Sequence, residues 1–369
     1  MKRLRIGIDI NEANVAQRVG TGQYCYHVLK HGNKREDINF HLYHRDPLQN
    51  DLPPENEHWH YHRIGPTRGW IRFGLPLYLL THHSASRRND VFWSPAHYAP
   101  IYTGCPSVVT IHDLAYEYFP DLFLPSDLYK LKHWSLAAAR SATRMIAVSQ
   151  ATKHDLVKLY DIPEDKITVV HNGYDSDIFN LTQKADEKIL SNYHLSPNSY
   201  LLFLGTIQPR KNAIKLVQAF HLLRESGYKG KLVIAGSIGW LADETLAVIK
   251  DSPDAGDIVL TDYVSDQTRK ALYSFADVYV LPSFYEGFGV PAIEAMACGT
   301  PVAVANNSSL PEVVGDAGLF FNAADPADIA RAITEIKSDR EHWVKKGLAR
   351  AKVFSWAKCA KETLDVLLQ

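Results

Sequence analysis

The sequence lacks paired cysteines, long apolar runs and a net charge, and each absence excludes a class of protein. None of its four cysteines has the CxxC spacing of a zinc or redox site, so neither a disulfide framework nor a zinc site is expected. No run of about 18 apolar residues is present, which excludes a transmembrane helix. The formal net charge is −1, so no overall field attracts nucleic acid, and we expect no nucleic-acid partner.

Strand-like and helical stretches alternate along the chain, which indicates mostly parallel sheets with helices on both faces. One series of strands runs from residue 3 to residue 149, and a second begins near Tyr200. We therefore predict an α/β protein with two doubly wound, Rossmann-like domains that face a central cleft. The predicted boundaries are 1–172 for the N-terminal domain, 173–198 for a linker, 199–354 for the C-terminal domain, and 355–369 for a last helix that packs on the N-terminal domain.

Residues 284–301, FYEGFGVPAIEAMACGTP, carry the strongest chemical signal. Their two loop glycines let backbone N–H groups approach a ligand closely, and Pro291 fits the first turn of a helix. The N-terminus of such a helix favours anionic or hydroxyl-rich ligands. Glu286 in the loop and Glu294 in the helix can accept hydrogen bonds from separate sets of hydroxyls, which a nucleotide sugar presents. The alternative is a surface loop with a capping glutamate.

A second signal lies at the end of another predicted strand, in the sequence LLFLGTIQPRKN (201–212). The buried strand leads into a turn of small residues at Gly205 and then into two adjacent cations, Arg210 and Lys211. Arginine supplies fixed, forked donors and lysine a compact charge, and together they can bind a diphosphate. Elsewhere on a protein such a pair is usually solvated surface.

Two weaker signals lie in the first domain. The apolar run 108–111 delivers His112 and Asp113 to a strand end, where the alternative is a helix cap beside a core histidine. The loop Gly20-Thr21-Gly22 follows the first predicted strand and resembles a ligand loop, although a lone GxG is common. It is no dinucleotide fingerprint, because the GxGxxG of dehydrogenases is absent.

Two further patterns resemble metal sites. His58, His60 and His62 alternate, so they should share one face of a strand, and no carboxylate or cysteine completes a site there. Asp175-Ser176-Asp177 is a DxD motif within the predicted linker, and a structural aspartate is the simpler interpretation. We expect no metal site.

Residues 68–80, RGWIRFGLPLYLL, mix aromatic, aliphatic and basic side chains, and Arg87 and Arg88 follow. Such a stretch could rest on a membrane interface, where lipid-linked acceptors lie. The interpretation we favour is a buried helix, because the strand-like residues 91–94 follow at once.

Seven motifs along the chain form one set: the Gly20 loop, TIHDL at 110–114, VSQATK at 148–153, Asn172-Gly173, residues 205–212, EGFGVPAIEAMACGTPV at 286–302, and FSW at 354–356. With these motifs, residues 1–369 resemble the retaining glycosyltransferases of family 4, which have the GT-B architecture. One departure is His171, which replaces the proline common before Asn172-Gly173.

The resemblance implies that the N-terminal domain binds the acceptor and the C-terminal domain binds the nucleotide sugar, with a role for each matching residue of the second domain. Arg210 and Lys211, beside Gly205, would neutralise the donor diphosphate, and Glu294 would bind the ribose hydroxyls. Glu286 and the backbone of the four residues that follow would hold the transferred sugar. These four are Gly287, Phe288, Gly289 and Val290.

In the first domain, Gly20, with Gly22 in the same loop, would let the backbone approach the phosphate. His112 would lie near the sugar and the reacting centre. The expected catalytic set is therefore His112, Glu286, Arg210 and Lys211.

The implied activity is transfer of a hexose, with retention, from GDP-mannose or UDP-glucose to a glycan or lipid-linked glycan. The reaction would serve cell-surface polysaccharide or lipopolysaccharide synthesis without a metal or other cofactor. We expect a cytoplasmic protein, with peripheral contact at the inner face of the membrane as the alternative. The alternative functions are a non-catalytic subunit that binds nucleotide sugars or glycans, and a sucrose- or phosphorylase-type transferase on the same fold.

Overall fold

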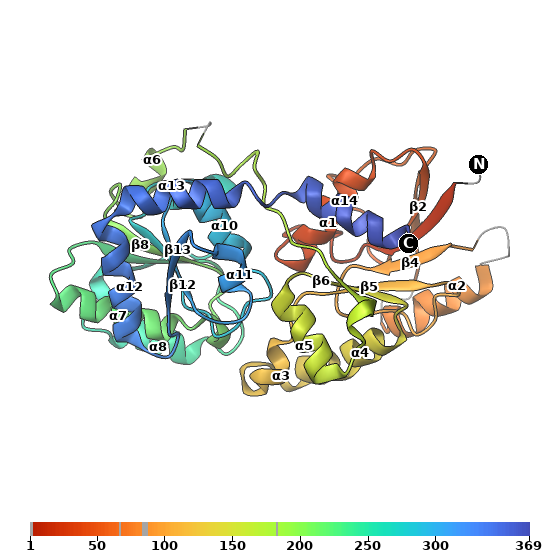
Figure 1. Ribbon diagram of the computed structural model, residues 1–369, viewed down its shortest axis with the longest axis horizontal. Coiled ribbons are helices and arrows are strands. Elements are labelled where there is room, and N and C mark those ends of the chain that lie inside the picture. The colour runs from red at the N-terminus through yellow and green to blue at the C-terminus, as the bar shows by residue number, and fades with distance from the viewer. Residues whose placement is uncertain (1–2, 66–67, 83–87, 182–183) are drawn as a thin grey trace. The chain divides into compact units, whose positions relative to one another are not determined.

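The computed structural model describes residues 3–65, 68–82, 88–181 and 184–369, which form two compact units (Figure 1). The first unit comprises the chain up to Glu117, Pro125–Gly173 and Trp356–Gln369. The second comprises Tyr118–Leu124 and Tyr174–Ser355. Each unit is a doubly wound parallel sheet, so the predicted fold class is confirmed.

The first unit has a seven-stranded parallel sheet in the order β3-β2-β1-β4-β5-β6-β7. The strand order reverses beside β1, and ligands of such sheets bind at the carboxyl ends of the strands near this point. The strands are β1 (Leu4–Asp9), β2 (Ile38–His44), β3 (Trp59–Arg63), β4 (Val91–Ser94), β5 (Ser107–Ile111), β6 (Arg144–Ala147) and β7 (Ile167–Val169). The helices are α1 (Thr21–Gly32), α2 (Leu75–His82) with the π-helix η1 (Trp70–Gly74) before it, α3 (Ala115–Tyr118), α4 (Pro125–Ser141), α5 (Gln150–Tyr160) and α14 (Trp356–Leu367).

Neighbouring residues of its strands belong to two different apolar cores, because side chains alternate across a sheet. Leu42 and Trp93 belong to the core under α1 and α14, whereas Tyr43 and Phe92 belong to the core beside α2. The ring of Trp356 stacks on His27 of α1, with centroids 4.8 Å apart. The C-terminal helix α14 is therefore part of the first unit.

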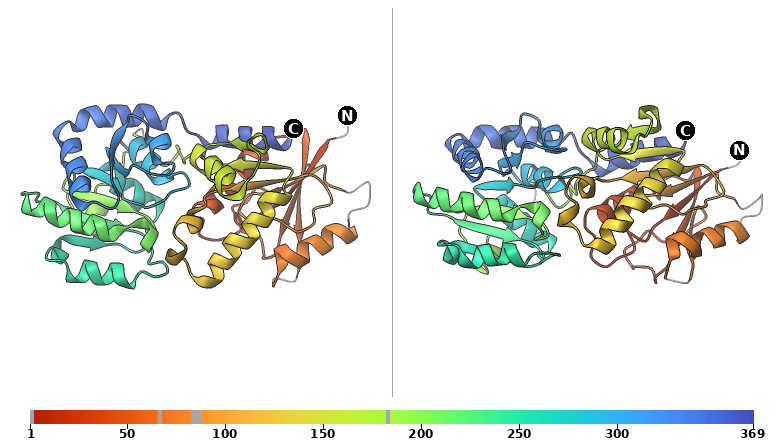
Figure 2. Two further views of the ribbon diagram at one scale, coloured as in Figure 1. Left: turned by 60° about the horizontal axis from the view of Figure 1, so that its bottom comes forward. Right: turned by 90° about the horizontal axis from the view of Figure 1, so that it is seen from below.

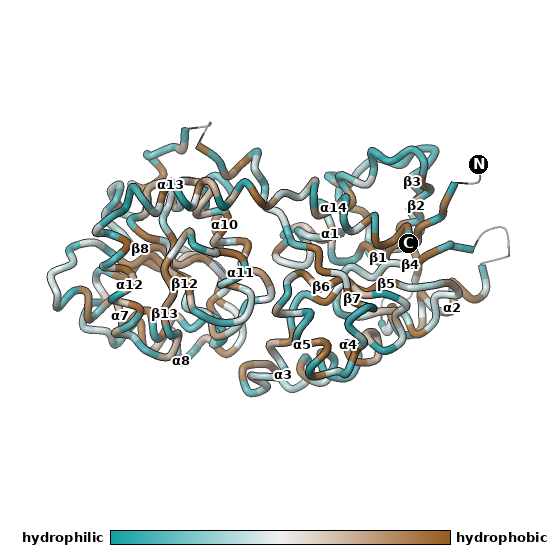
Figure 3. Tube along the Cα trace, viewed as in Figure 1, coloured by the Kyte–Doolittle hydropathy of each residue, from teal (hydrophilic) through white to brown (hydrophobic). Residues whose placement is uncertain are grey.

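The second unit repeats this plan with six parallel strands in the order β10-β9-β8-β11-β12-β13. Its central strands are among the most apolar stretches of the chain (Figure 3). Helices lie on both faces of the sheet (Figure 2). The strands are β8 (Tyr200–Leu204), β9 (Lys231–Ala235), β10 (Ile258–Leu260), β11 (Val278–Leu281), β12 (Val302–Ala305) and β13 (Gly318–Phe321). The helices are α6 (Lys188–Ser191), α7 (Ala213–Glu225), α8 (Asp243–Asp251), α9 (Asp266–Ser274), α10 (Val290–Ala297), α11 (Leu310–Val314), α12 (Pro326–Ser338) and α13 (Arg340–Ala351).

Helix α2 differs from the buried helix that we expected. Leu75 and Leu79 are buried, but the opposite face exposes Leu77 and Leu80. Because the helix is apolar on both faces, its sequence pattern could not show which face is buried in the unit and which is exposed. Among the described residues, no helix combines the length and apolarity needed to cross a bilayer.

The first unit contains buried histidines whose pKa values lie far below the ordinary value. Burial lowers the pKa of His27 to about 3 and that of His112 to about 4. Burial also lowers the pKa of His62 to about 4. Asp9 differs from these histidines, because burial raises its pKa to about 7. As the pH falls, folded Asp9 takes up a proton that the unfolded chain does not, so its contribution to the stability of the fold increases.

We predict that acid destabilises the first unit selectively. Between pH 6.5 and 5 the unfolded chain binds protons that the folded histidines do not, so stability is lost as the pH falls. Each such histidine contributes about 1.5 kcal/mol over this window, and Asp9 offsets one of the three. Five of the seven tryptophans lie in the first unit, so urea unfolding followed by tryptophan fluorescence reports it.

The test variant is His27→Gln in the first unit, which should reduce the loss of stability between pH 6.5 and 5. Equal urea midpoints for the wild type at the two pH values would contradict the prediction.

Candidate active site

The predicted cations and Glu286 form one charge cluster in the second unit. The loop after β8 carries Arg210 and Lys211, and the loop after the adjacent strand β11 carries Glu286, so both loops lie at one sheet edge. Lys211 Nζ donates to Glu286 Oε1 at 2.5 Å, and Arg210 Nη1 lies 3.6 Å from Oε2. Arg210 Nη1 also donates to the carbonyl oxygen of Tyr285 at 2.5 Å. We call Arg210, Lys211 and Glu286 the charge cluster.

Three serines hold Glu286 in place. Ser283 Oγ donates to Glu286 Oε1 at 2.6 Å. The backbone N–H of Glu286 donates to Ser308 Oγ at 2.9 Å, and Ser309 Oγ donates to its carbonyl oxygen at 2.8 Å. The carboxylate is therefore positioned before any ligand binds.

Glu286 is only 7% exposed, yet it remains ionised. Burial raises the pKa of its carboxyl group, but the charges of Lys211 and Arg210 outweigh this effect and hold the pKa below the ordinary value. Two cations and one anion leave the cluster with one positive charge. Arg210 Nε is buried and has no hydrogen-bond partner among the described residues.

Glu294 lies in α10 and has different partners. Arg269 of α9 forms a short ion pair with Glu294 Oε2, and the hydroxyl of Tyr273 donates to the same oxygen at 3.1 Å. Burial raises the pKa of Glu294 above its ordinary value, although Arg269 opposes the rise. Arg269 was not predicted from the sequence, because a single arginine on a helix gives no signal until its partner is known.

Glycine is required at two turns of this site. Gly289 precedes α10 with φ of 97°, and an added Cβ would lie 2.7 Å from a Leu310 methyl group. Gly236 follows β9 with φ of 137°, and a Cβ there would lie 2.2 Å from the carbonyl oxygen of Gly205. The turn at Gly236 therefore packs closely against the backbone of Gly205. The sequence alone gave no sign of this contact.

Asn212 fixes the loop that carries the two cations. Its φ is 59°, in the left-handed region that asparagine tolerates better than most residues. Its side-chain Nδ2 donates to the carbonyl oxygens of Pro282 at 2.9 Å and Ala323 at 2.8 Å. One amide thus links the loop after β8 to the ends of β11 and β13.

The predicted sugar loop offers its backbone rather than its aromatic side chain. Phe288 is buried and packs edge-on against Phe354, with ring centroids 5.5 Å apart. Gly287 precedes it, and Val290 begins α10. This arrangement suits the predicted role of the backbone of residues 287–290.

His112 lies in the first unit at the end of β5. Its Nε2 donates to the carbonyl oxygen of Pro95 at 2.8 Å, and its ring packs edge-on against Tyr24. Burial, together with the nearby His97, lowers the pKa of His112 to about 4, so the ring is neutral at pH 7. The other ring nitrogen, Nδ1, is then the acceptor.

The glycine loop precedes α1 in the same unit. Gly20 has φ of 42° and open space around an added Cβ, so only its backbone conformation favours glycine. A Cβ on Gly22 would lie 2.7 Å from the carbonyl oxygen of Glu12. Asp9, with its pKa of about 7, ends β1 and was missed by the sequence analysis.

Neither metal-like pattern gathers a ligand set. His62 stacks on His41 of β2, and their ring nitrogens lie 2.9 Å apart. Asp175 Oδ1 accepts a hydrogen bond from the Asp177 N–H at 3.0 Å, as a turn cap does. In the described part of the chain, no three His, Cys, Asp or Glu residues are grouped in a way that could hold a metal.

Comparison with known proteins gives the site its context. Family models match both halves of the chain, "Glycosyltransferase Family 4" over residues 20–178 and "Glycosyl transferases group 1" over residues 186–349. The O-antigen chain mannosyltransferase B of Escherichia coli is 36% identical over 267 residues, which cover 70% of this chain and 69% of the relative. The chain belongs to glycosyltransferase family 4.

Two further similarities cover more of this glycosyltransferase. The D-inositol 3-phosphate glycosyltransferase 2 of Catenulispora acidiphila is 32% identical over 335 residues, which cover 82% of this chain and 78% of the relative. The solved structure of sucrose-phosphate synthase from Thermosynechococcus elongatus has a TM-score of 0.78 at 19% identity, and covers 99% of this chain and 98% of that one. The second similarity shows the two-domain GT-B fold alone.

We predict that Asn212→Ala lowers the stability of the second unit by about 2–4 kcal/mol. The change leaves two buried carbonyls without their donor and places alanine in a left-handed conformation. Asn212→Gly should cost less, because it loses the hydrogen bonds but not the backbone freedom. Thermal unfolding of the two variants beside the exposed control Asn192→Ala measures the difference.

Equal melting temperatures for Asn212→Ala and Asn212→Gly would show that the backbone conformation contributes nothing. A wild-type melting temperature for both would contradict the linking role of Asn212.

Proposed function

We propose that this glycosyltransferase moves a hexose, with retention, from a nucleotide-diphosphate sugar to a glycan or lipid-linked glycan. The observation that carries the proposal is the charge cluster, which leaves one positive charge at the carboxyl ends of β8 and β11. A nucleotide diphosphate is the anionic ligand that such a position suits.

The difficult step is cleavage of the anomeric carbon–oxygen bond while the diphosphate leaves. Negative charge then develops on the leaving phosphate, and fixed cations stabilise it most effectively. Arg210 and Lys211 have this role in the proposal. Glu286, held ionised, accepts hydrogen bonds from the sugar hydroxyls, and Glu294 accepts them from the ribose.

His112 has a separate role in the proposal, as a neutral ring near the reacting sugar. Because its Nε2–H donates to Pro95, the ring orientation is fixed and Nδ1 is left to accept a hydrogen bond. A neutral ring adds no positive charge that would compete for the leaving phosphate.

Mannose is the sugar we propose, with GDP-mannose as donor, and UDP-glucose is the second candidate. The support is the similarity to a protein named as an O-antigen mannosyltransferase, which also suggests cell-surface polysaccharide synthesis. No metal takes part in the proposal, since two side-chain cations already face the diphosphate.

Replacing either cation by alanine should nearly abolish transfer. Removal of one preorganised donor to a developing charge typically costs about 10²–10³ in rate. Arg210→Ala and Lys211→Ala should therefore lose at least a hundredfold in kcat with GDP-mannose or UDP-glucose, measured by release of the nucleotide diphosphate. The matched control is Lys229→Ala, an exposed lysine of the same unit, which should keep wild-type turnover.

Loss of Lys211 also leaves Glu286 with one cation fewer, so each variant needs a melting temperature beside its rate. Wild-type turnover of Arg210→Ala or Lys211→Ala at saturating donor would contradict the assignment. Loss of wild-type transfer in excess chelator would contradict the metal-free mechanism.

We further propose that α2 contacts an anionic membrane. Phe73, Leu77 and Leu80, spaced along one helical face, are 72%, 61% and 61% exposed. Between Glu57 and Asp90 the sequence has five arginines and no acidic residue. Of these, Arg68 and Arg88 are exposed, whereas Arg87 lies outside the described residues. An apolar face beside uncompensated positive charge is typical of a helix that lies on a bilayer surface.

The triple variant Phe73→Ser, Leu77→Ser, Leu80→Ser should weaken binding to anionic vesicles more than tenfold. Burial of each Phe or Leu side chain stabilises by about 1.5–3 kcal/mol, and the exposed positions carry no packing cost on substitution. Co-sedimentation with vesicles that contain phosphatidylglycerol measures binding, with Val157→Ser as the control for an exposed apolar residue of the same unit. Absence of wild-type binding at low salt would contradict membrane contact.

A further inference from the structure

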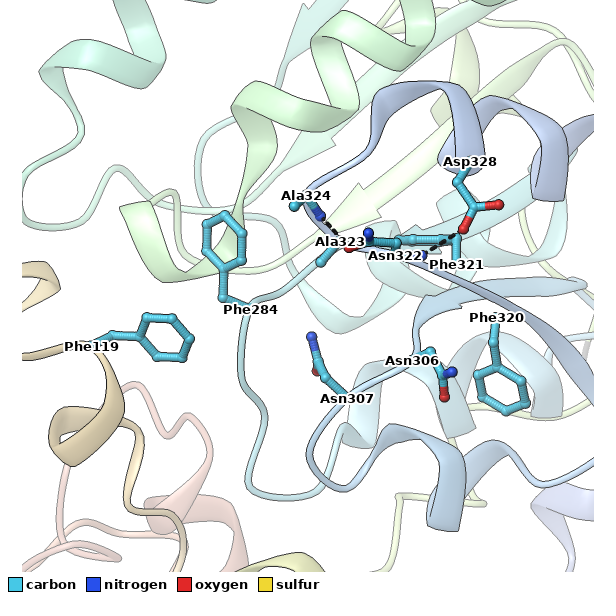
Figure 4. A pocket seen from close by; sticks show the side chains of 10 residues that line it. All are labelled: Phe119, Phe284, Asn306, Asn307, Phe320, Phe321, Asn322, Ala323, Ala324 and Asp328. Carbon is cyan, nitrogen blue, oxygen red and sulfur yellow. Dashed lines mark hydrogen bonds between the residues drawn. The ribbon is translucent and has the colours of Figure 1, made fainter.

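The second unit contains a cavity of about 570 Å³ beyond the carboxyl ends of β12 and β13 (Figure 4). Its walls come from the residues that follow these two strands, from α12, and from Phe119 and Phe284. Sites for small ligands typically measure about 300–1,000 Å³. The cavity is therefore large enough for a ligand of several rings.

Three asparagine amides line this cavity, and each retains capacity for hydrogen bonds. The exposed side chain of Asn306 makes no hydrogen bond to the described residues. Asn322 accepts from the Ala324 N–H at 3.0 Å through Oδ1, which leaves its two N–H donors for a ligand. Asn307 donates one N–H to the carbonyl oxygen of Ser283 at 3.1 Å and has a second.

Aromatic rings form the other part of the wall. Phe119 and Phe284 stack with centroids 5.9 Å apart and an angle of 30°, and Figure 4 shows them together at one end. Phe320 lines the cavity from β13. All three rings are only half-buried, so part of each is open to a ligand.

The lining contains no lysine or arginine. Its one acid, Asp328, is already engaged, because Oδ2 accepts from the Asn322 N–H at 2.7 Å and Oδ1 from Arg331 at 2.7 Å. A phosphate would find no cation here, in contrast to the charge cluster. An uncharged ligand with hydroxyl groups and apolar ring faces fits this lining best.

Carbohydrate chains have these properties. The C–H faces of a pyranose ring carry partial positive charge and pack on the negative face of an aromatic ring. The hydroxyls at the ring edge pair with amide groups, which both donate and accept. Aromatic faces beside side-chain amides thus match a sugar chain at two independent points.

We propose that this cavity is a carbohydrate-binding subsite that holds part of the glycan acceptor or product away from the diphosphate site. The inference rests on the proposed function in one respect, that the acceptor is a glycan. The ligand class itself, a neutral oligosaccharide, is assigned from the lining alone.

Three hydrogen bonds join the subsite to the charge cluster. The N–H of Phe284 donates to the carbonyl oxygen of Arg210 at 3.0 Å. Asn307 holds the carbonyl of Ser283, whose hydroxyl group donates to Glu286. A glycan in the cavity therefore contacts the loop that positions the predicted sugar-binding carboxylate.

The test blocks the cavity without touching the charge cluster. Ala324 lines the cavity and is exposed, so Ala324→Trp should fill it while leaving the fold intact. The probes are α-linked mannose oligosaccharides of two to six residues, and binding to the full chain is followed by saturation-transfer NMR and calorimetry. We expect Ala324→Trp to weaken hexasaccharide binding at least tenfold.

Asn306→Ala removes one amide at an exposed position and should weaken binding about three- to tenfold, the value of one hydrogen bond. Asn192→Ala, another exposed asparagine of the second unit, is the matched control and should bind as the wild type does. With transfer assays, Ala324→Trp should raise KM for the hexasaccharide acceptor and leave KM for the donor and the turnover of a monosaccharide acceptor unchanged.

Wild-type oligosaccharide affinity in both Ala324→Trp and Asn306→Ala would overturn the subsite. Displacement of the oligosaccharide from the cavity by uridine or guanosine at lower concentration would overturn the ligand class, since nucleobases also stack on aromatic rings. Failure of the proposed function gives a different result, because transfer would then be absent while the two variants still weaken oligosaccharide binding.

Discussion

The ionised state of Glu286 depends on two cations supplied by a different loop, and much of the second unit serves to keep the three groups together. A buried carboxylate without partners would be strongly unfavourable, so Lys211 and Arg210 are needed for the fold of this loop as well as for a ligand. Asn212 then fixes the cation loop, and three serines fix Glu286. In the proposed function, a diphosphate at this position would share donors that already have a partner, which limits reorganisation at the moment of reaction.

The two glutamates have similar burial but different electrostatic surroundings. Glu286 has two adjacent cations and a pKa below its ordinary value, whereas Glu294 has one and a pKa above it. If the same cations lay at the same distances from both carboxylates, Glu286 and Glu294 would be electrostatically equivalent. Their separate partners are consistent with the separate roles proposed for them, the sugar for Glu286 and the ribose for Glu294.

The sequence predicted the two doubly wound sheets and singled out the three residues of the charge cluster, because both depend on local patterns, but it did not predict that these residues pair with one another. Apolar strands followed by glycine and charged residues mark the carboxyl edge of a parallel sheet, and this edge brought Arg210, Lys211 and Glu286 together. Long-range partners gave no such signal. Arg269, the turn of Gly236 and the amide of Asn212 acquire their meaning from residues 25, 31 and up to 111 positions away. The edge strand β7 lies outside the predicted series of residues 3–149, since it is short and only partly buried.

The chain passes between the two units four times, at Glu117, Leu124, Gly173 and Ser355. No single cut in the gene can therefore separate the units into two complete pieces. A fragment that ends after residue 173 would lack α14, whose Trp356 stacks on His27, and a fragment that begins there would lack Phe119, one wall of the aromatic cavity. Recombination that exchanged the whole second unit between relatives would have to transfer two separate segments at once, so this connectivity favours evolution of the two units as a pair.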